Sequence, residues 1–130
     1  DCVGSELAKQ SYNWRAFIDM GVHMCGSSDC PVEVFDILPN IYHCVTRANK
    51  DGSKTWYPEN GVTIDEAVRM FTIEGAYASF EESVKGSITV GKLADFVVLD
   101  CDIYEADPTE LLKTNVEMTV IEGEVVYKKR

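Results

Sequence analysis

The sequence has few histidines, few basic residues and no long apolar run, so it lacks the features of zinc-motif, nucleic-acid-binding and membrane-spanning proteins. Its 130 residues include two histidines, His23 and His43, and neither belongs to an H-x-H or H-E-x-x-H pair, so no complete zinc motif is present. No apolar run approaches the roughly twenty residues that cross a bilayer. Basic residues are also scarce. The 12 basic residues against 22 acidic ones give a net charge of −10, which disfavours nucleic acid as a partner.

Cysteine pairs with metal or redox spacing are missing too. The five cysteines form no C-x-x-C pair: Cys2, Cys25, Cys30, Cys44 and Cys101. An odd number at scattered spacings does not make a disulfide framework, so we expect reduced thiols and a cytoplasmic location. The first residues show neither the basic nor the apolar region of a secretory leader. Because the sequence begins with Asp1 instead of Met, we expect further polypeptide upstream.

What the sequence does contain is the composition of a folded domain, with 45% hydrophobic and 26% charged residues. Apolar spacing predicts helices over residues 5–20, 36–47 and 63–80. The last has the clearest start, because Thr63 and Glu66 form a capping box. On this helix we expect one apolar stripe of residues that are bulky at first and small toward the end, which would let the helix sit close against a sheet: Val68, Phe71, Gly75 and Ala78.

Strand patterns occupy the rest of the chain. A brief apolar run over residues 22–25 predicts a buried strand that ends at a polar turn. In the C-terminal part, the Glu122-Gly123 pair between two apolar runs predicts a tight hairpin. The expected C-terminal elements are strands over residues 96–99, 118–121 and 125–127, with a short helical turn over residues 107–112.

Asp29 is the first candidate for chemistry, because it follows the predicted strand in a turn of small residues. Parallel α/β folds place reacting groups at that end of their strands. The alternative is an ordinary Asx turn or a helix cap ahead of Pro31. For His23 and His43 we favour structural or exposed roles, since neither has a second histidine at metal-ligand spacing.

Two motifs resemble the amidohydrolase superfamily. Residues 26–33, GSSDCPVE, are similar to its G-S-D-x-P-V-E segment, with one extra Ser. Residues 86–100, GSITVGKLADFVVLD, resemble its K-G-S-L-x-x-G-K-x-A-D-x-V-V-L-D signature. The likeness runs from Trp14 to Tyr127, and its nearest branch is amidohydrolase family 3, which holds N-substituted formamide deformylases and related exoenzymes.

This resemblance implies an α/β fold. Residues 1–84 would supply the last strand-helix units of a TIM-like (β/α)₈ barrel, and residues 85–130 the C-terminal strands of a small β-sandwich. Asp29 would bind a divalent metal, zinc by family analogy, and accept a proton from the attacking water. The family's remaining metal ligands have no counterpart here, so we expect no metal on this chain alone. Val32, Glu33 and Trp56 would contact substrate at the pocket mouth.

Two functions remain open at this point. The first is a catalytically incomplete C-terminal part of a metal-dependent hydrolase of non-peptide carbon–nitrogen bonds, whose partners are an amide-type small molecule and the upstream part of the same polypeptide. The second is a stand-alone interaction or oligomerisation module derived from such an enzyme. In either case we expect a homo-oligomer, without nucleic acid or membrane, because strands taken from a larger assembly leave unpaired edges.

Overall fold

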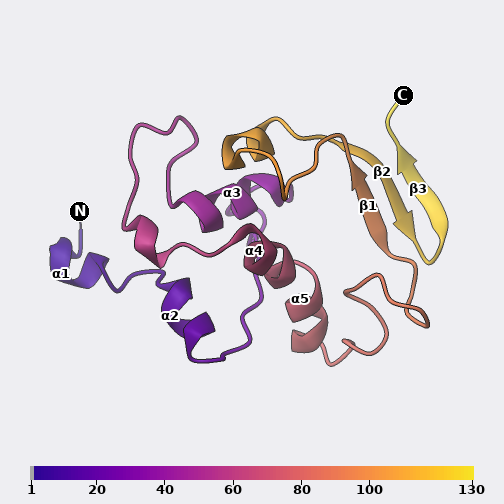
Figure 1. The fold of residues 1–130 in the computed structure, drawn as a ribbon, viewed down its shortest axis with the longest axis horizontal. Coiled ribbons are helices and arrows are strands. Elements are labelled where there is room, and N and C mark those ends of the chain that lie inside the picture. Colours follow the sequence, from indigo (N-terminus) through magenta and orange to yellow (C-terminus); the bar gives the residue numbers. More distant parts are fainter. Residues whose placement is uncertain (1) are drawn as a thin grey trace.

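The computed structural model describes residues 2–130 and is an assembly of short helices with one small sheet (Figure 1). The sheet lies at the C-terminal end of the molecule, and the N-terminal helix lies at the opposite end. The elements in chain order are α1 (Gly4–Ala8), α2 (Trp14–Asp19), α3 (Leu38–Thr46), the 3₁₀ helix η1 (Pro58–Asn60), α4 (Ile64–Met70), α5 (Ile73–Ala78), β1 (Phe96–Leu99), the 3₁₀ helix η2 (Pro108–Leu112), β2 (Val116–Ile121) and β3 (Glu124–Lys128).

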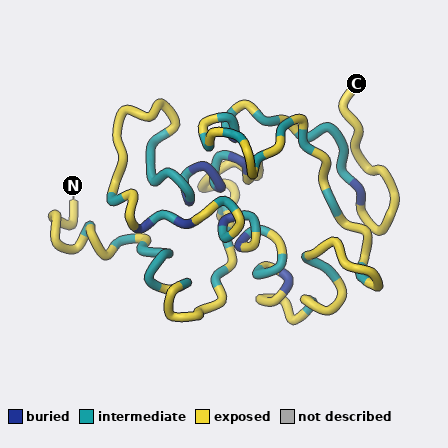
Figure 2. The backbone as a smooth tube through the Cα atoms, in the orientation of Figure 1, coloured by how far each residue is buried: buried dark blue, intermediate teal, exposed yellow. Residues whose placement is uncertain are grey.

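The core surrounds α3, the helix expected over residues 36–47. Its Pro39 lies in the first turn, where a missing amide hydrogen costs nothing. Tyr42 is 2% exposed, and Ala67 on α4 is completely buried beside it in the same cluster. Leu111 from η2 closes the cluster from the C-terminal segment. Buried backbone in Figure 2 is concentrated at this meeting of α3, α4 and η2.

The helix expected over residues 63–80 is two helices. Its start is confirmed, because Thr63 and Glu66 make the capping box in both directions. The chain then leaves helical geometry at Thr72, where φ is −131° and ψ is −92°, and α5 begins at the next residue. The prediction of one apolar stripe was wrong for its small residues. Gly75 and Ala78 are exposed, and the residues that α4 and α5 bury are Ala67, Met70 and Ala76.

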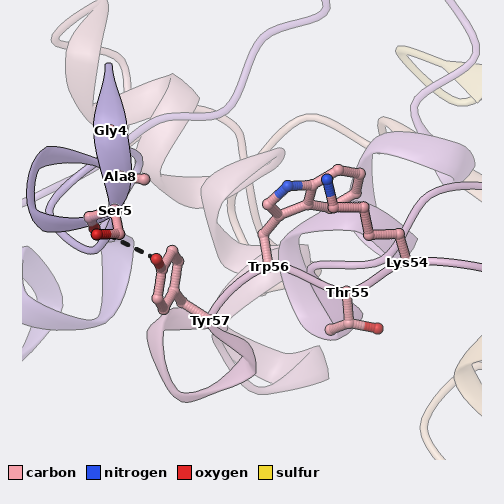
Figure 3. Close-up of a pocket in the computed structure, with 7 residues that line it drawn as sticks. All are labelled: Gly4, Ser5, Ala8, Lys54, Thr55, Trp56 and Tyr57. Atoms are coloured by element: carbon pink, nitrogen blue, oxygen red, sulfur yellow. Dashed lines mark hydrogen bonds between the residues drawn. The ribbon is translucent and has the colours of Figure 1, made fainter. Parts of the chain in front are cut away.

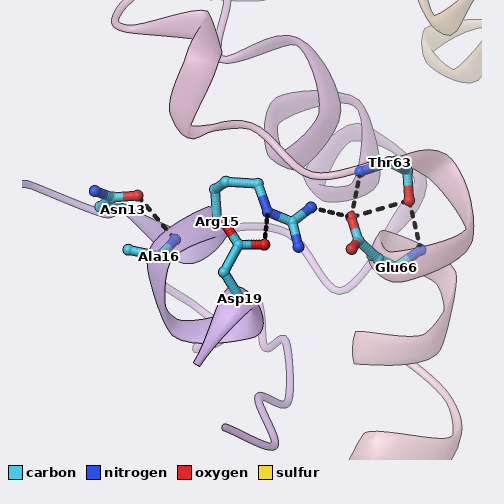
Figure 4. A network of polar contacts seen from close by, with 6 residues as sticks. All are labelled: Asn13, Arg15, Ala16, Asp19, Thr63 and Glu66. Atoms are coloured by element: carbon cyan, nitrogen blue, oxygen red, sulfur yellow. Dashed lines mark hydrogen bonds and ion pairs between the residues drawn. The ribbon is translucent and has the colours of Figure 1, made fainter. Parts of the chain in front are cut away.

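An ion-pair network ties α2 to the start of α4 (Figure 4). The Arg15 guanidinium donates to Glu66 Oε2 at 2.7 Å and to Asp19 Oδ1 at 2.8 Å. The Thr63 amide donates to the same Glu66 oxygen at 2.8 Å. The hydrogen bond from Arg15, aided by those from Thr63, lowers the pKa of the Glu66 carboxyl from 4.5 to about 2. The charged form of Glu66 therefore helps to hold the N-terminal segment on the core.

The helix expected over residues 5–20 is also interrupted. Tyr12 lies at φ +52°, and Asn13 starts α2 as its N-cap, with its side-chain oxygen accepting the Ala16 amide at 3.1 Å. Asn is a favoured N-cap because its short side chain reaches back to the first orphan amides. The end of α2 agrees with the expected stop before Gly21, which lies at φ +75°.

The strand expected over residues 22–25 is absent from the described residues and was wrong as secondary structure. The segment is extended, but it has no neighbouring strand with which to form a ladder. Its contacts are with helices instead: the Gly26 amide donates to the Met70 carbonyl at 2.9 Å, at the end of α4. A strand needs an adjacent strand, and an apolar run in the sequence does not supply one.

The C-terminal sheet agrees with the sequence pattern. The strands form an antiparallel meander in the order β1-β2-β3. Glu122 and Gly123 make the hairpin turn, both with positive φ, at +51° and +83°. Val120 is the buried residue of these strands at 4% exposure, and all of β3 is exposed. The sheet therefore has two open edges and little cover on its faces.

The accessible surface area of the molecule is larger than that of an average folded monomer of the same mass. Its accessible area is 8839 Å², whereas folded monomers of 14.5 kDa average about 6,900 Å². Large apolar side chains contribute to the excess, among them Phe35 at 85%, Phe80 at 92% and Ile88 at 88% exposure. The boundary expected between residues 84 and 85 stays a prediction. Across it, η2 contributes Leu111 to the core of the preceding segment.

We predict that Glu66→Gln destabilises the chain at pH 7 by roughly 2 kcal/mol, less than the pKa shift alone implies because 24% of the side chain is exposed. Gln keeps the capping hydrogen bonds and removes the charge. Because the folded-state pKa of Glu66 is lowered, its contribution is present above about 4.5 and is lost as the pH falls toward 2. Urea unfolding at several pH values measures this, with the exposed Glu105→Gln as control. A difference that stays constant down to pH 2.5 would contradict it.

We also predict that the 130-residue chain self-associates through its sheet. Open strand edges and exposed apolar side chains favour pairing with a second copy. Light scattering is expected to give a mass above 14.5 kDa, and Val126→Lys on β3 is expected to reduce it. Ser83→Lys, which adds the same charge on an exposed turn, is the matched control. A monodisperse monomer with cooperative unfolding would refute self-association.

Candidate functional site

The candidate site is the turn at residues 26–33. It begins beside the end of α4, where the Gly26 amide binds the Met70 carbonyl, and its residues are largely exposed. Asp29 lies at φ +50°, a conformation that Asp adopts more readily than most residues. Its amide donates to Ser27 Oγ at 3.0 Å, and its carbonyl accepts the Val32 amide at 2.9 Å. The Glu33 amide donates to the Ser28 carbonyl at 3.1 Å. The turn is thus closed by the backbone and one hydroxyl.

The carboxylate of Asp29 differs from those of the other loop aspartates. Six of them accept a backbone amide at 2.8–3.1 Å, four from the residue two positions later, as loop aspartates usually do, and two from a distant segment: Asp36, Asp51, Asp102 and Asp107, then Asp95 and Asp100. Within residues 2–130 the Asp29 carboxylate accepts none, and the residue is exposed. The Asx-turn alternative therefore does not describe Asp29, and its charged oxygens are left for another partner.

The donor set around Asp29 does not make a metal site by itself. In the part of the chain that the structure describes, no three His, Cys, Asp or Glu side chains are grouped so as to hold a metal ion. A catalytic zinc takes about three protein ligands, and Asp29 offers one. Any metal at this turn would need ligands from outside these residues.

The three expected substrate contacts do not lie in one cleft. Val32 and Glu33 belong to the Asp29 turn and are exposed, Val32 at 76%. Trp56 lines a cleft of about 400 Å³ between α1 and the loop before η1, which none of Asp29, Val32 and Glu33 lines (Figure 3). The Lys54 ammonium lies 4.7 Å from the Trp56 ring centre. Substrate binding by Val32, Glu33 and Trp56 stays a prediction.

Arg47 fixes the loop that carries Trp56. It ends α3 at φ +57° and donates through Nε to the Trp56 carbonyl at 3.1 Å. Its two remaining nitrogens donate to the carbonyls of Tyr12 at 2.9 Å and Ser11 at 3.2 Å. The guanidinium also lies 5.0 Å from the Trp14 ring centre. One side chain thus joins the N-terminal segment, α3 and the aromatic loop.

The histidines make structural contacts, as expected. The ring of His43 lies with Nδ1 2.7 Å from the Ala48 carbonyl. His23 is exposed, with Nδ1 2.7 Å from Glu74 Oε2 and its ring stacked on Tyr77 at 4.0 Å. All five cysteines are free thiols. Burial raises the pKa of the Cys44 thiol to about 11, so this thiol is not a nucleophile at neutral pH.

A second cleft separates the α4–α5 pair from the sheet. It measures about 920 Å³, and among the residues that line it are Phe71, Ile73, Ile88, Phe96 and Val97. Phe71 also reaches the Asp29 turn, because its ring covers Gly26. The apolar spacing of the sequence predicts Phe71 on a helix stripe and does not predict this contact. No local signal indicates it, since the two residues are far apart in the chain.

Comparison with known proteins gives the family. The model of the amidohydrolase family matches residues 1–127 of this chain. This chain belongs to the amidohydrolase family. YtcJ of Bacillus subtilis (strain 168) is 30% identical over 99% of the chain, which covers 25% of YtcJ. N-substituted formamide deformylase of Arthrobacter pascens is 35% identical over 88% of the chain, which covers 21% of that protein.

A solved structure extends the likeness to the fold. The amidohydrolase from Thermotoga maritima MSB8 superposes with a TM-score of 0.68 over 91% of this chain, at 21% sequence identity, and the match covers 26% of the Thermotoga chain. The α/β arrangement with a small antiparallel sheet is therefore an amidohydrolase fold. The chain spans about a quarter of the length of the relatives it matches. No helix within residues 2–130 has the length and apolar character needed to cross a membrane.

We predict that the 130-residue chain binds zinc more weakly than about 1 μM, because Asp29 lacks two further ligands nearby. Calorimetry under reducing conditions measures the affinity. Asp29→Ala is expected to leave the weak binding unchanged, and a variant with exposed Cys25 and Cys30 changed to Ser controls for thiol binding. Micromolar or tighter binding that Asp29→Ala abolishes would contradict the prediction.

Proposed function

We propose that this chain is the C-terminal part of a metal-dependent hydrolase of non-peptide carbon–nitrogen bonds, with Asp29 as its proton-transfer residue. The single observation that carries the proposal is the Asp29 carboxylate, which the turn leaves out of every backbone hydrogen bond found in residues 2–130. The family assignment supports the reaction class. One matching relative is named as a deformylase of N-substituted formamides, which is a reaction at a carbon–nitrogen bond.

The chemistry asked of Asp29 is general base and then general acid catalysis. As water attacks the carbonyl carbon of an amide, the carboxylate takes one of its protons. When the carbon–nitrogen bond breaks, the same proton passes to the leaving nitrogen, so the carboxylate is regenerated. An exposed carboxylate with no competing amide donor is suited to both transfers, because its oxygens are available at each step.

The finer assignments belong to the same proposal. Asp29 would also be one ligand of a divalent metal, zinc by family analogy, and ligands from elsewhere in the polypeptide would complete that site; such an ion would polarise the carbonyl. Residues 1–84, with the extended segment over residues 22–25, would belong to the last part of a TIM-like barrel. Strands β1–β3 would belong to a small sandwich. The open edges of the sheet and the extended but unpaired segment support this arrangement, since both lack neighbours here.

The alternative of a stand-alone interaction module has one observation in its favour, the poorly covered sheet. The same sheet is expected in a hydrolase whose remaining strands cover it. The available Asp29 carboxylate favours the hydrolase, because a module that only associates has no use for it.

We predict that Asp29→Asn lowers kcat about a hundredfold or more in the longer amidohydrolase polypeptide that carries these residues. Asn keeps the shape of the side chain but cannot take the proton from water. Turnover of formamide and cyclic imide substrates is measured together with metal content and unfolding temperature. Asp51→Asn, in an exposed loop where Asp51 accepts the Ser53 amide, is the control and is expected to keep full turnover.

Two outcomes are informative in that experiment. Loss of kcat with unchanged folding supports the proton-transfer role. A variant that keeps a tenth or more of the wild-type kcat with full metal content would show that Asp29 has another role.

A further inference from the structure

The interruption between α4 and α5 has a structural use. In an uninterrupted helix the Met70 carbonyl would accept the amide of residue 74. Here the helix stops at Met70 and restarts at Ile73, and the Gly26 amide donates to the Met70 carbonyl at 2.9 Å. The end of α4 thus supplies an acceptor for the segment that leads to Asp29. Carbonyls at a helix end need such outside partners.

Phe71, the first residue after α4, sets how closely the segment at Gly26 approaches the end of α4. A Cβ added to Gly26 would lie 2.6–2.8 Å from three atoms of the Phe71 ring, nearer than carbon atoms can approach. Gly26 does not have a positive φ, so its backbone does not require glycine. The limit is one of space, and the tip of the Phe71 ring sets it, so a methyl at residue 26 requires either the ring or the segment to shift.

The same segment is held a second time, three residues earlier. His23 Nδ1 lies 2.7 Å from Glu74 Oε2, and the His23 ring stacks on Tyr77 at an interplanar angle of 22°. Arg69 Nη2 lies 3.5 Å from the other Glu74 oxygen. Both partners of His23 come from α5, whereas those of Gly26 come from the end of α4 and the residue after it. The extended segment is therefore fixed on each side of the interruption, without a strand ladder.

We propose that the α4–α5 interruption is the device that positions Asp29, with Phe71 as its positioning residue. This inference rests on the proposed function, because it assigns a purpose to the placement of the Asp29 carboxylate. Asp29 follows Gly26 by three residues, in a turn closed by Ser27 Oγ and the Val32 amide. A closed turn moves with its anchor, so a displacement of Gly26 displaces the carboxylate.

The test is a compensating pair of substitutions in the longer polypeptide. Gly26→Ala is expected to lower kcat at least about tenfold with KM changed less than about threefold, because a misplacement of about 1 Å can cost a hundredfold. Phe71→Ala added to it removes the ring that the new methyl meets, and is expected to restore kcat at least about fivefold. Gly75→Ala is the matched control, since an added Cβ there meets nothing within 4 Å.

A structural readout accompanies the kinetics. Crystal structures of the Gly26→Ala and double variants are expected to show residue 29 displaced in the first and returned in the second. If Gly26→Ala does not fold, Phe71→Leu serves, with an expected kcat loss of about threefold or more at an unchanged unfolding temperature. Full kcat in Gly26→Ala, or no recovery in the double variant, would overturn the proposal, as would full kcat in Phe71→Leu.

Failure of this inference is distinguishable from failure of the proposed function. If Asp29→Asn keeps its turnover, the proposed function fails, and the displacement of residue 29 in the crystal structures still tests the anchor. If Asp29→Asn loses turnover and Gly26→Ala does not, the positioning role alone fails. In an Asp29→Asn background, Gly26→Ala is expected to lower kcat no further, because the group it misplaces is already absent.

Discussion

The packing of α3 against α4 and η2 is the constraint on which the remaining structure depends. Tyr42 and Ala67 are its most buried members, and Ala67 is small enough for the two helices to approach closely. The segments that carry the candidate residues are attached to this centre: the Asp29 turn through the end of α4 and the aromatic loop through Arg47, as is the sheet through η2. Because few residues are buried, each side chain that links an outlying segment to this centre contributes much to holding that segment in place.

Two kinds of link perform this attachment. Charged side chains hold the N-terminal segment, through Arg15 on Glu66 and through Arg47 on the backbone carbonyls of Ser11 and Tyr12. Such bonds are directional and stronger than neutral ones, which suits a segment with few apolar contacts. Steric contact holds the Asp29 turn, through Phe71 on Gly26. A ring against a backbone fixes a distance more sharply than a long flexible side chain does, and the proton-transfer role proposed for Asp29 requires that accuracy.

The large accessible surface is consistent with the family relationship. The chain corresponds to about a quarter of the length of its relatives, and strand β3 of its sheet is exposed throughout. Apolar side chains that remain uncovered here are those that a larger amidohydrolase has room to cover. The same uncovered strands are the reason why we expect association between copies of the chain.

The sequence by itself determined what depends on neighbouring residues. The capping box at Thr63, the hairpin turn at Gly123 and the strand over Phe96–Leu99 were each predicted, because their signals act over a few residues. Asp29 was proposed as a site residue in the same way, from a local turn and a family motif, and its role stays a prediction. Only the tertiary structure decided that the helix after Thr63 stops at Met70. The carbonyl exposed there is used by Gly26, a residue distant in the sequence, and a partner of that kind leaves no periodic signal in either segment.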